Sequence, residues 1–305
     1  MLYSAAALLF ALGDSISKVL LISGLDATRL SQLRLTGACA AIACVLLVVN
    51  RQAFRIARRD IPVLLAYGIV GVALTQTFTY LAYARLSIGV ALLVVFSAPV
   101  LVALWFVVVR REPSSKLLWG SLSLVFAGLA LVAQPWSGLN LDGLGALSAV
   151  LAAFCYASYY ILGDREVRGA NRRHPASMVL WGFVGGALFW AIVLPWWSFP
   201  FEKFATSVAL GGGGPEVSFA LLAIVLILGC TVAAFYLAVA SLRHIQGSQA
   251  STVALVGLPF SAAIAWALLG ESLSPIQLTG MAVVLVGVAL AERVRGRQGS
   301  QRIVG

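Results

Sequence analysis

Long stretches without a single charged residue constrain this 305-residue chain more than any other feature. Each is long enough to cross a bilayer, because about 20 helical residues span a hydrocarbon core of ~30 Å. The uncharged runs are 61–84, 86–109, 117–141, 143–163, 175–201, 217–242, 245–270 and 272–291. Only 10% of the residues are charged and 61% are apolar, so a water-soluble fold is excluded.

Two further apolar segments, 2–22 and 28–50, contain charged residues but have the length of a span. We count both, which predicts an all-α membrane protein with ten transmembrane helices. The first of them has no basic leading segment, so we expect a retained helix and not a signal peptide.

The basic residues indicate how the spans run through the membrane. With a cytoplasmic N-terminus, sixteen of the 21 Lys and Arg residues fall in inside loops or the C-terminal tail, whereas only Arg29, Arg85 and Lys203 fall outside. This excess inside predicts that both termini are cytoplasmic. The preference for Arg over Lys, together with abundant Ala and Gly, suggests a bacterial inner (plasma) membrane.

The sequence contains an internal repeat. Spans three to five and eight to ten share Tyr-Leu-Ala, Pro, Glu and Gly in the same order at nearly the same spacing. The matched positions are Tyr80 to Ala82 with Tyr236 to Ala238, Pro99 with Pro259, Glu112 with Glu271, and Gly128 with Gly287. An odd number of spans in each half predicts that the second repeat is inverted relative to the first. We expect repeats over 1–134 and 141–294, followed by a cytoplasmic tail over 295–305.

The same residues carry a resemblance to a known family. Gly13-Asp14-Ser15 with Lys18 in the first span, Arg34 in the second, and the repeated Pro, Glu and Gly resemble the EamA-type drug/metabolite transporters. This resemblance implies a ten-helix, inverted-repeat carrier that exports amino acids or other small metabolites.

Asp14, Lys18 and Arg34 are charged residues inside spans. Asp14 lies ~18 Å and Lys18 ~24 Å from the inner face, and Arg34 lies ~9 Å below the outer face. Asp14 and Lys18 share one helical face, so we expect an ion pair. In one interpretation Arg34 or Lys18 attracts a substrate carboxylate while Asp14 holds them or relays a proton. In the other, the basic side chains reach the outer headgroups and Asp14 only pairs with them.

Other polar and aromatic residues inside the spans are candidates for lining a substrate cavity. Pro99 and Pro259, near the middle of spans four and nine, each remove a backbone hydrogen bond and are candidate hinges; permanent packing kinks are the alternative. The complete candidate site for substrate binding or coupling is Asp14, Lys18, Arg34, Gln76, Tyr80, Phe96, Tyr156, Tyr160, Tyr236 and Trp266.

An enzyme is not expected, because the chain has two His and no GxSxG or HExxH motif. We therefore expect no catalytic residues, metal or cofactor. The predicted function is alternating-access export of small amphipathic metabolites, with amino acids first; a polyspecific drug or organic-anion efflux carrier, or a channel, are the alternatives. The expected partners are a small-molecule substrate and the lipid bilayer, with no nucleic acid; a proton is a candidate coupling ion, and a monomer is consistent with the sequence.

Overall fold

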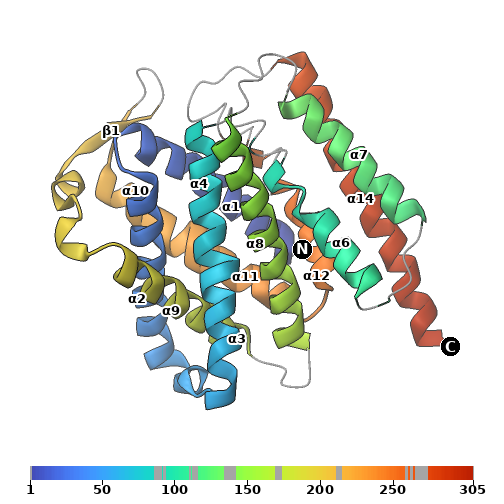
Figure 1. The fold of residues 1–305 in the computed structure, drawn as a ribbon, viewed down its shortest axis with the longest axis horizontal. Coiled ribbons are helices and arrows are strands. Elements are labelled where there is room, and N and C mark those ends of the chain that lie inside the picture. Colours follow the sequence, from blue (N-terminus) through green and yellow to red (C-terminus); the bar gives the residue numbers. More distant parts are fainter. Residues whose placement is uncertain are drawn as a thin grey trace.

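A computed structural model describes most of the chain, and helices make up nearly all of the described part (Figure 1). The description excludes residues 1, 86–90, 92–93, 110, 112–115, 134–141, 169–173, 211–214, 258–259, 262–263, 265–273 and 305. Four residues singled out from the sequence, Glu112, Pro259, Trp266 and Glu271, lie outside the described residues.

The chain contains both uninterrupted helices and helices that are broken into segments. In the first half they are α1 (Leu2–Ile22), α2 (Ala27–Val49), α3 (Ile61–Ala66), η3 (Tyr67–Leu74), α4 (Thr75–Arg85), α6 (Ala98–Val108) and α7 (Lys116–Ala133). In the second half they are α8 (Gly143–Arg168), α9 (Pro175–Val193), α10 (Phe219–Ile227), η7 (Leu228–Ala233), α11 (Ala234–Ser241), α12 (Gly247–Ala254) and α14 (Pro275–Val304). Short 3₁₀ turns fill several connections: η1 (Arg51–Phe54), η2 (Arg58–Asp60), η5 (Trp196–Ser198) and η6 (Phe201–Ala205).

The segments η3 and η7 are π-helical and stand at related positions in the two halves. A wider π turn leaves a backbone carbonyl without its ordinary partner, and a threonine hydroxyl supplies one in both cases. Thr75 Oγ1 donates to the Val70 carbonyl at 3.2 Å, and Thr231 Oγ1 donates to the Leu226 carbonyl at 2.7 Å. Both threonines precede the tyrosine of the repeated Tyr-Leu-Ala motif by five residues.

The helix path breaks where a proline is expected to disturb it. Residues 96–97 form a turn, and α6 begins directly after it with Pro99 in its first turn. Proline suits that position because the first turn of a helix does not use the missing N–H. A second turn, at residues 255–256, follows the end of α12 in the other half.

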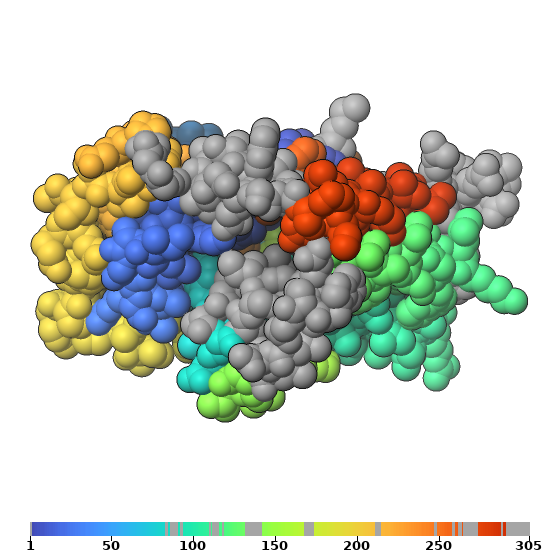
Figure 2. All heavy atoms as spheres, turned by 90° about the horizontal axis from the view of Figure 1, so that it is seen from above, coloured from blue at the N-terminus to red at the C-terminus, as the bar shows by residue number. Residues whose placement is uncertain are grey.

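The helices α7 and α14 pack closely on each other at one end of the molecule, in both views (Figures 1 and 2). Glycines make this approach possible: a Cβ at Gly128 would lie 2.7 Å from the Gly280 carbonyl, and one at Gly287 would lie 3.0 Å from the Val125 nitrogen. Gly128 also faces Val284. The contacts are reciprocal, since Gly128 and Gly287, like Val125 and Val284, are 159 residues apart.

The described part of the connection from α9 to α10, residues 194–210 and 215–218, lies at the end of the molecule opposite α7 and α14 (Figure 1). Trp196, Phe199, Phe201 and Phe204 pack ring against ring there, with Phe199 only 4% exposed. An antiparallel hairpin of β1 (Ser207–Ala209) and β2 (Glu216–Ser218) completes the connection. The helical prediction is confirmed for most of the described chain, and this hairpin is the departure from it.

Six helices in the described part of the chain are long and apolar enough to cross a membrane. They are Leu2–Ile22, Ala27–Val49, Arg58–Ala82, Gly143–Val167, Pro175–Val193 and Phe219–Ser241. Three shorter apolar helices, Ala98–Val108, Trp119–Leu131 and Pro275–Gly287, fall within other predicted spans. The number of ten stays a prediction. The helix α14 continues to Val304, so most of the expected tail extends this helix.

Candidate functional site

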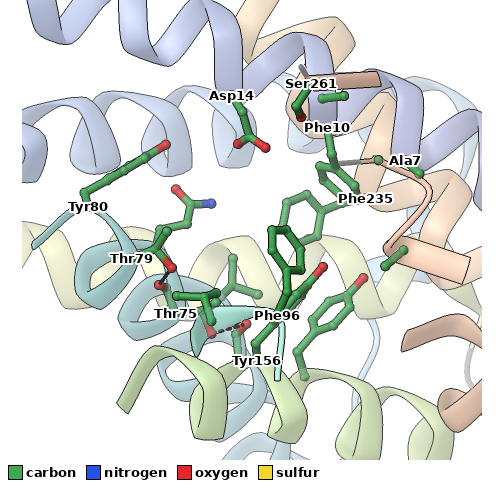
Figure 3. A pocket seen from close by; sticks show the side chains of 18 of the residues that line it. Ala7, Phe10, Asp14, Thr75, Thr79, Tyr80, Phe96, Tyr156, Phe235 and Ser261 are labelled. Carbon is green, nitrogen blue, oxygen red and sulfur yellow. Dashed lines mark hydrogen bonds between the residues drawn. The ribbon is translucent and has the colours of Figure 1, made fainter. Parts of the chain in front are cut away.

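A cavity with a volume of about 130 Å³ lies between helices of both halves of the chain. Polar side chains from α1, α2 and α4 line one part of it: Asp14, Arg34, Thr75, Gln76 and Thr79. Aromatic side chains line another part: Phe10, Phe96, Tyr156, Tyr159 and Phe235. Figure 3 shows Asp14 pointing into this space, with Thr75 and Thr79 on one side and Phe235 on the other.

The Asp14 side chain is exposed although it lies ~18 Å along α1, because it faces the cavity. Close packing of α1 on η7 places it there, since a Cβ at the preceding Gly13 would lie 2.8 Å from the Cys230 Cβ. Arg34 interacts with it electrostatically. Within the described part of the chain, however, no hydrogen bond or ion pair joins the Asp14 carboxylate to another side chain. A carboxylate is thus available to a ligand in the cavity.

The Arg34 side chain is only 4% exposed, and three hydrogen bonds fix its guanidinium. Its Nε donates to Thr231 Oγ1 at 2.7 Å, Nη1 to the Tyr80 hydroxyl at 3.2 Å, and Nη2 to the Cys230 carbonyl at 3.3 Å. The Tyr80 hydroxyl in turn donates to Ser17 Oγ at 3.4 Å. A guanidinium has five N–H groups, so two of them have no partner among the described residues.

The π-helical segment η7 supplies two of these three acceptors. The Cys230 carbonyl accepts from Nη2, and the Thr231 hydroxyl both accepts from Nε and donates to the Leu226 carbonyl. A helix of the second half therefore orients an arginine of the first half. The sequence signal for Thr231 is its place five residues before Tyr236, equivalent to Thr75 before Tyr80.

Gln76 extends the polar lining. Its Oε1 atom is buried and has no hydrogen-bond partner among the described residues. A buried amide oxygen without a partner costs free energy, so this atom is a candidate acceptor for a ligand N–H or O–H group.

The aromatic part of the cavity is built from rings on four elements. Phe10 and Phe235 meet edge to face at a centroid distance of 5.1 Å, and Phe235 meets Tyr159 in the same way at 5.8 Å. Phe96 contacts Tyr156 at 6.3 Å, at the turn that precedes α6. These rings offer a wide apolar surface beside the charged residues, which suits an amphipathic ligand.

The structure brings six of the candidate residues from the sequence to the cavity: Asp14, Arg34, Gln76, Tyr80, Phe96 and Tyr156. Lys18 does not line it. Tyr160 is fully buried behind Tyr156, and Tyr236 is 40% exposed on the outside of the helix. Of the two candidate hinges, Pro99 is buried directly after the turn at 96–97, whereas Pro259, like Trp266, is outside the described residues.

Sequence reasoning missed several lining residues, among them Phe10, Thr75, Thr79 and Phe235. Periodicity in an apolar helix does not show which face meets a cavity, and only Thr75 carried a usable repeat signal. In the described part of the chain no group of three or more His, Cys, Asp or Glu side chains is placed to hold a metal.

Comparison with known proteins agrees with this architecture. The EamA-like transporter family matches residues 1–134 and 143–292, so the chain belongs to this family and is a multi-pass membrane protein. The uncharacterized transporter YdfC of Bacillus subtilis (strain 168) is 24% identical over 232 residues, which cover 75% of this chain and 71% of YdfC. A solved crystal structure with 17% identity covers 97% of both chains at a TM-score of 0.75, which shows the shared fold.

Proposed function

We propose that this protein is a secondary carrier that exports small amphipathic metabolites, with amino acids as the leading class. The observation that carries this proposal is that Asp14 and Arg34, two opposite charges, both line the polar part of an aromatic-lined cavity. A transporter family supplies the general activity. The cavity supplies the chemistry that a substrate must match.

A zwitterion with an apolar side chain matches that chemistry. Its carboxylate accepts from the two remaining N–H groups of Arg34, since guanidinium–carboxylate pairs favour such geometry. Its ammonium group lies near Asp14, and its side chain packs on rings such as Phe96 and Phe235. Each charge of the substrate then meets an opposite charge, which offsets the cost of leaving water.

Alternating access requires two bundles that move relative to one another, and we propose that the two repeats supply them. The paired π segments, the paired helix breaks and the reciprocal glycine contacts of α7 with α14 support ten spans in two inverted repeats. The breaks at 96–97 and 255–256 are the proposed hinges. The charge distribution supports cytoplasmic termini in a bacterial inner membrane.

A second candidate substrate class is an organic cation, as in polyspecific drug efflux. It is favoured by one observation, the available Asp14 carboxylate beside several aromatic faces, because cations bind to such faces. An organic cation does not use the remaining N–H groups of Arg34, so an Arg34→Gln variant separates the classes: it loses zwitterion transport and keeps cation transport.

Asp14 is the proposed coupling residue, protonated in one part of the cycle and bound to substrate in the other. We expect Asp14→Asn to abolish the response of transport to a pH gradient across proteoliposomes. Glu202→Gln is the matched control, since Glu202 is an exposed carboxylate in η6, away from the cavity. An unchanged pH response in Asp14→Asn refutes the coupling role.

A further inference from the structure

Behind the cavity, three tyrosine hydroxyls form a continuous hydrogen-bonded chain. Tyr3 and Tyr160 are joined at 2.6 Å, and the Tyr160 hydroxyl donates to the Tyr156 hydroxyl at 2.9 Å. Tyr3 and Tyr160 are 2% and 0% exposed, whereas Tyr156 lines the cavity. The chain therefore leads from the interior of the helix bundle to the space that Asp14 faces.

The chain has a defined direction. A hydroxyl has a single hydrogen, so Tyr160, which donates to Tyr156, accepts from Tyr3. The hydrogen of Tyr156 is then left for an acceptor in the cavity. Tyr156 and Asp14 both line the cavity, which has room for several water molecules.

The far end of the chain lies near the end of α1. Tyr3 precedes Asp14 by eleven residues, which is ~16 Å along a helix, and α1 begins at Leu2. On α8, Asp164 follows Tyr160 by four residues, as Tyr160 follows Tyr156, so all three share one helical face. Asp164 is a carboxylate with 2% exposure, close to the end of α8 at Arg168. In the proposed orientation, both helix ends are on the inner side of the membrane.

We propose that Tyr156, Tyr160 and Tyr3 conduct protons between Asp14 and the inner side of the membrane. This inference rests on the proposed carrier function with Asp14 as the coupling residue. The ionisable groups that interact with the chain are Tyr159 from α8, Tyr67 from η3, and Asp14 from α1 across the cavity. Arg34 from α2 acts on Asp14.

The transfer balances at every oxygen. Rotation of each hydroxyl about its C–O bond first reverses the hydrogen bonds, so that Tyr156 donates to Tyr160 and Tyr160 donates to Tyr3. Asp14 then releases a proton through cavity water to the Tyr156 oxygen, Tyr156 passes its own proton to Tyr160, Tyr160 passes one to Tyr3, and Tyr3 releases one to the inner side. Each oxygen breaks one O–H bond and forms another, so one proton enters, one leaves, and no phenolate accumulates. The transfer leaves Tyr3 donating to Tyr160 and Tyr160 donating to Tyr156, which is the arrangement in the structure.

The test separates proton movement from substrate movement. Tyr160→Phe interrupts the chain and keeps the ring, and Tyr3→Phe interrupts it at the other end. Tyr67→Phe is the control, because Tyr67 is a buried ring stacked on Tyr159 at 5.4 Å and its hydroxyl is outside the chain. Each variant is reconstituted in proteoliposomes and assayed with labelled phenylalanine, leucine and threonine.

Counterflow moves substrate in both directions with no net proton transfer, whereas uptake driven by a pH gradient needs it. We expect Tyr160→Phe and Tyr3→Phe to keep counterflow within about twofold of wild type and to reduce uptake driven by the pH gradient at least tenfold. Tyr67→Phe is expected to equal wild type in both assays. Equal pH-driven uptake in wild type and Tyr160→Phe refutes proton conduction through the tyrosines but does not contradict the proposed carrier function. A parallel fall of both assays in the two chain variants assigns them a structural role and overturns the proposal.

Absence of wild-type counterflow with all three amino acids refutes the amino-acid assignment instead. Proton conduction through the tyrosines is then tested by measuring proton influx under a potassium diffusion potential, with a pH-sensitive dye inside the vesicles. Influx above that of empty liposomes, and at least tenfold slower in Tyr160→Phe, supports the chain. Equal influx in wild type and Tyr160→Phe overturns it.

Discussion

Thr231→Val tests whether η7 orients Arg34 for substrate binding. Valine has nearly the shape of threonine, so the change removes two hydrogen bonds, from Arg34 Nε and to the Leu226 carbonyl, with little change in packing. A hydrogen bond to a charged group contributes about 1.5–3 kcal/mol, which corresponds to roughly 10- to 150-fold in affinity. Neutral hydrogen bonds between membrane helices average about 0.6 kcal/mol, which corresponds to roughly threefold.

The two magnitudes are distinguishable in an assay of counterflow at increasing concentrations of labelled phenylalanine. We expect KM to rise at least tenfold in Thr231→Val and to return towards wild type in Thr231→Ser, which restores the hydroxyl. Thr77→Val is the matched control, since among the described residues the Thr77 hydroxyl bonds only the Ala73 carbonyl, one turn earlier along the same helical path. A KM within threefold of wild type in Thr231→Val contradicts the role of η7 in orienting Arg34.

Two further predictions concern stability in detergent. Gly128→Ala and Gly287→Ala each place a methyl group against the backbone of the facing helix, so we expect the free energy of unfolding to fall by about 1–3 kcal/mol and the Tm to fall with it. Gly120→Ala is the control and is expected to keep the Tm, because no described atom lies within 4 Å of the added methyl group. Equal Tm values for all three variants contradict the close approach of α7 and α14. His174 caps α9 by accepting the Ala176 N–H at Nδ1. Burial, with a smaller effect from Arg243, lowers the pKa of His174, so the folded protein favours the neutral imidazole. The contribution of His174 to stability is therefore complete above the unfolded pKa of about 6.5 and is lost as pH falls through the lower folded pKa. Thermal melting at pH 7.5 and 5.5 is expected to show a larger drop for wild type than for His174→Asn, which keeps a cap that does not titrate, and equal drops refute this.

The sequence predicted the membrane class because the uncharged runs leave few alternatives. It also located the charged pair of the site, since a charge inside an apolar run stands out by itself. The repeat pointed to Tyr80 and Tyr236 equally. The structure separates them, with Tyr80 buried beside Arg34 and Tyr236 on the outside of its helix.

Other features depend on tertiary contacts that no local pattern contains. An ion pair of Asp14 with Lys18 was expected from helical spacing, yet Arg34 is the charged partner that acts on Asp14, and it lies on another helix. Thr231 acquires its role only because η7 packs against α2. The tyrosine chain joins residues 157 positions apart, and nothing near Tyr3 in the sequence indicates this.

The central claim is that the cavity binds and moves a small zwitterion. Counterflow in proteoliposomes tests it most directly: vesicles are loaded with a mixed amino-acid panel, and uptake of labelled phenylalanine, leucine and threonine is followed against empty liposomes. We predict saturable uptake that requires substrate inside the vesicles and is lost in Arg34→Gln. Uptake equal to that of empty liposomes for all three amino acids would contradict the proposed substrate class.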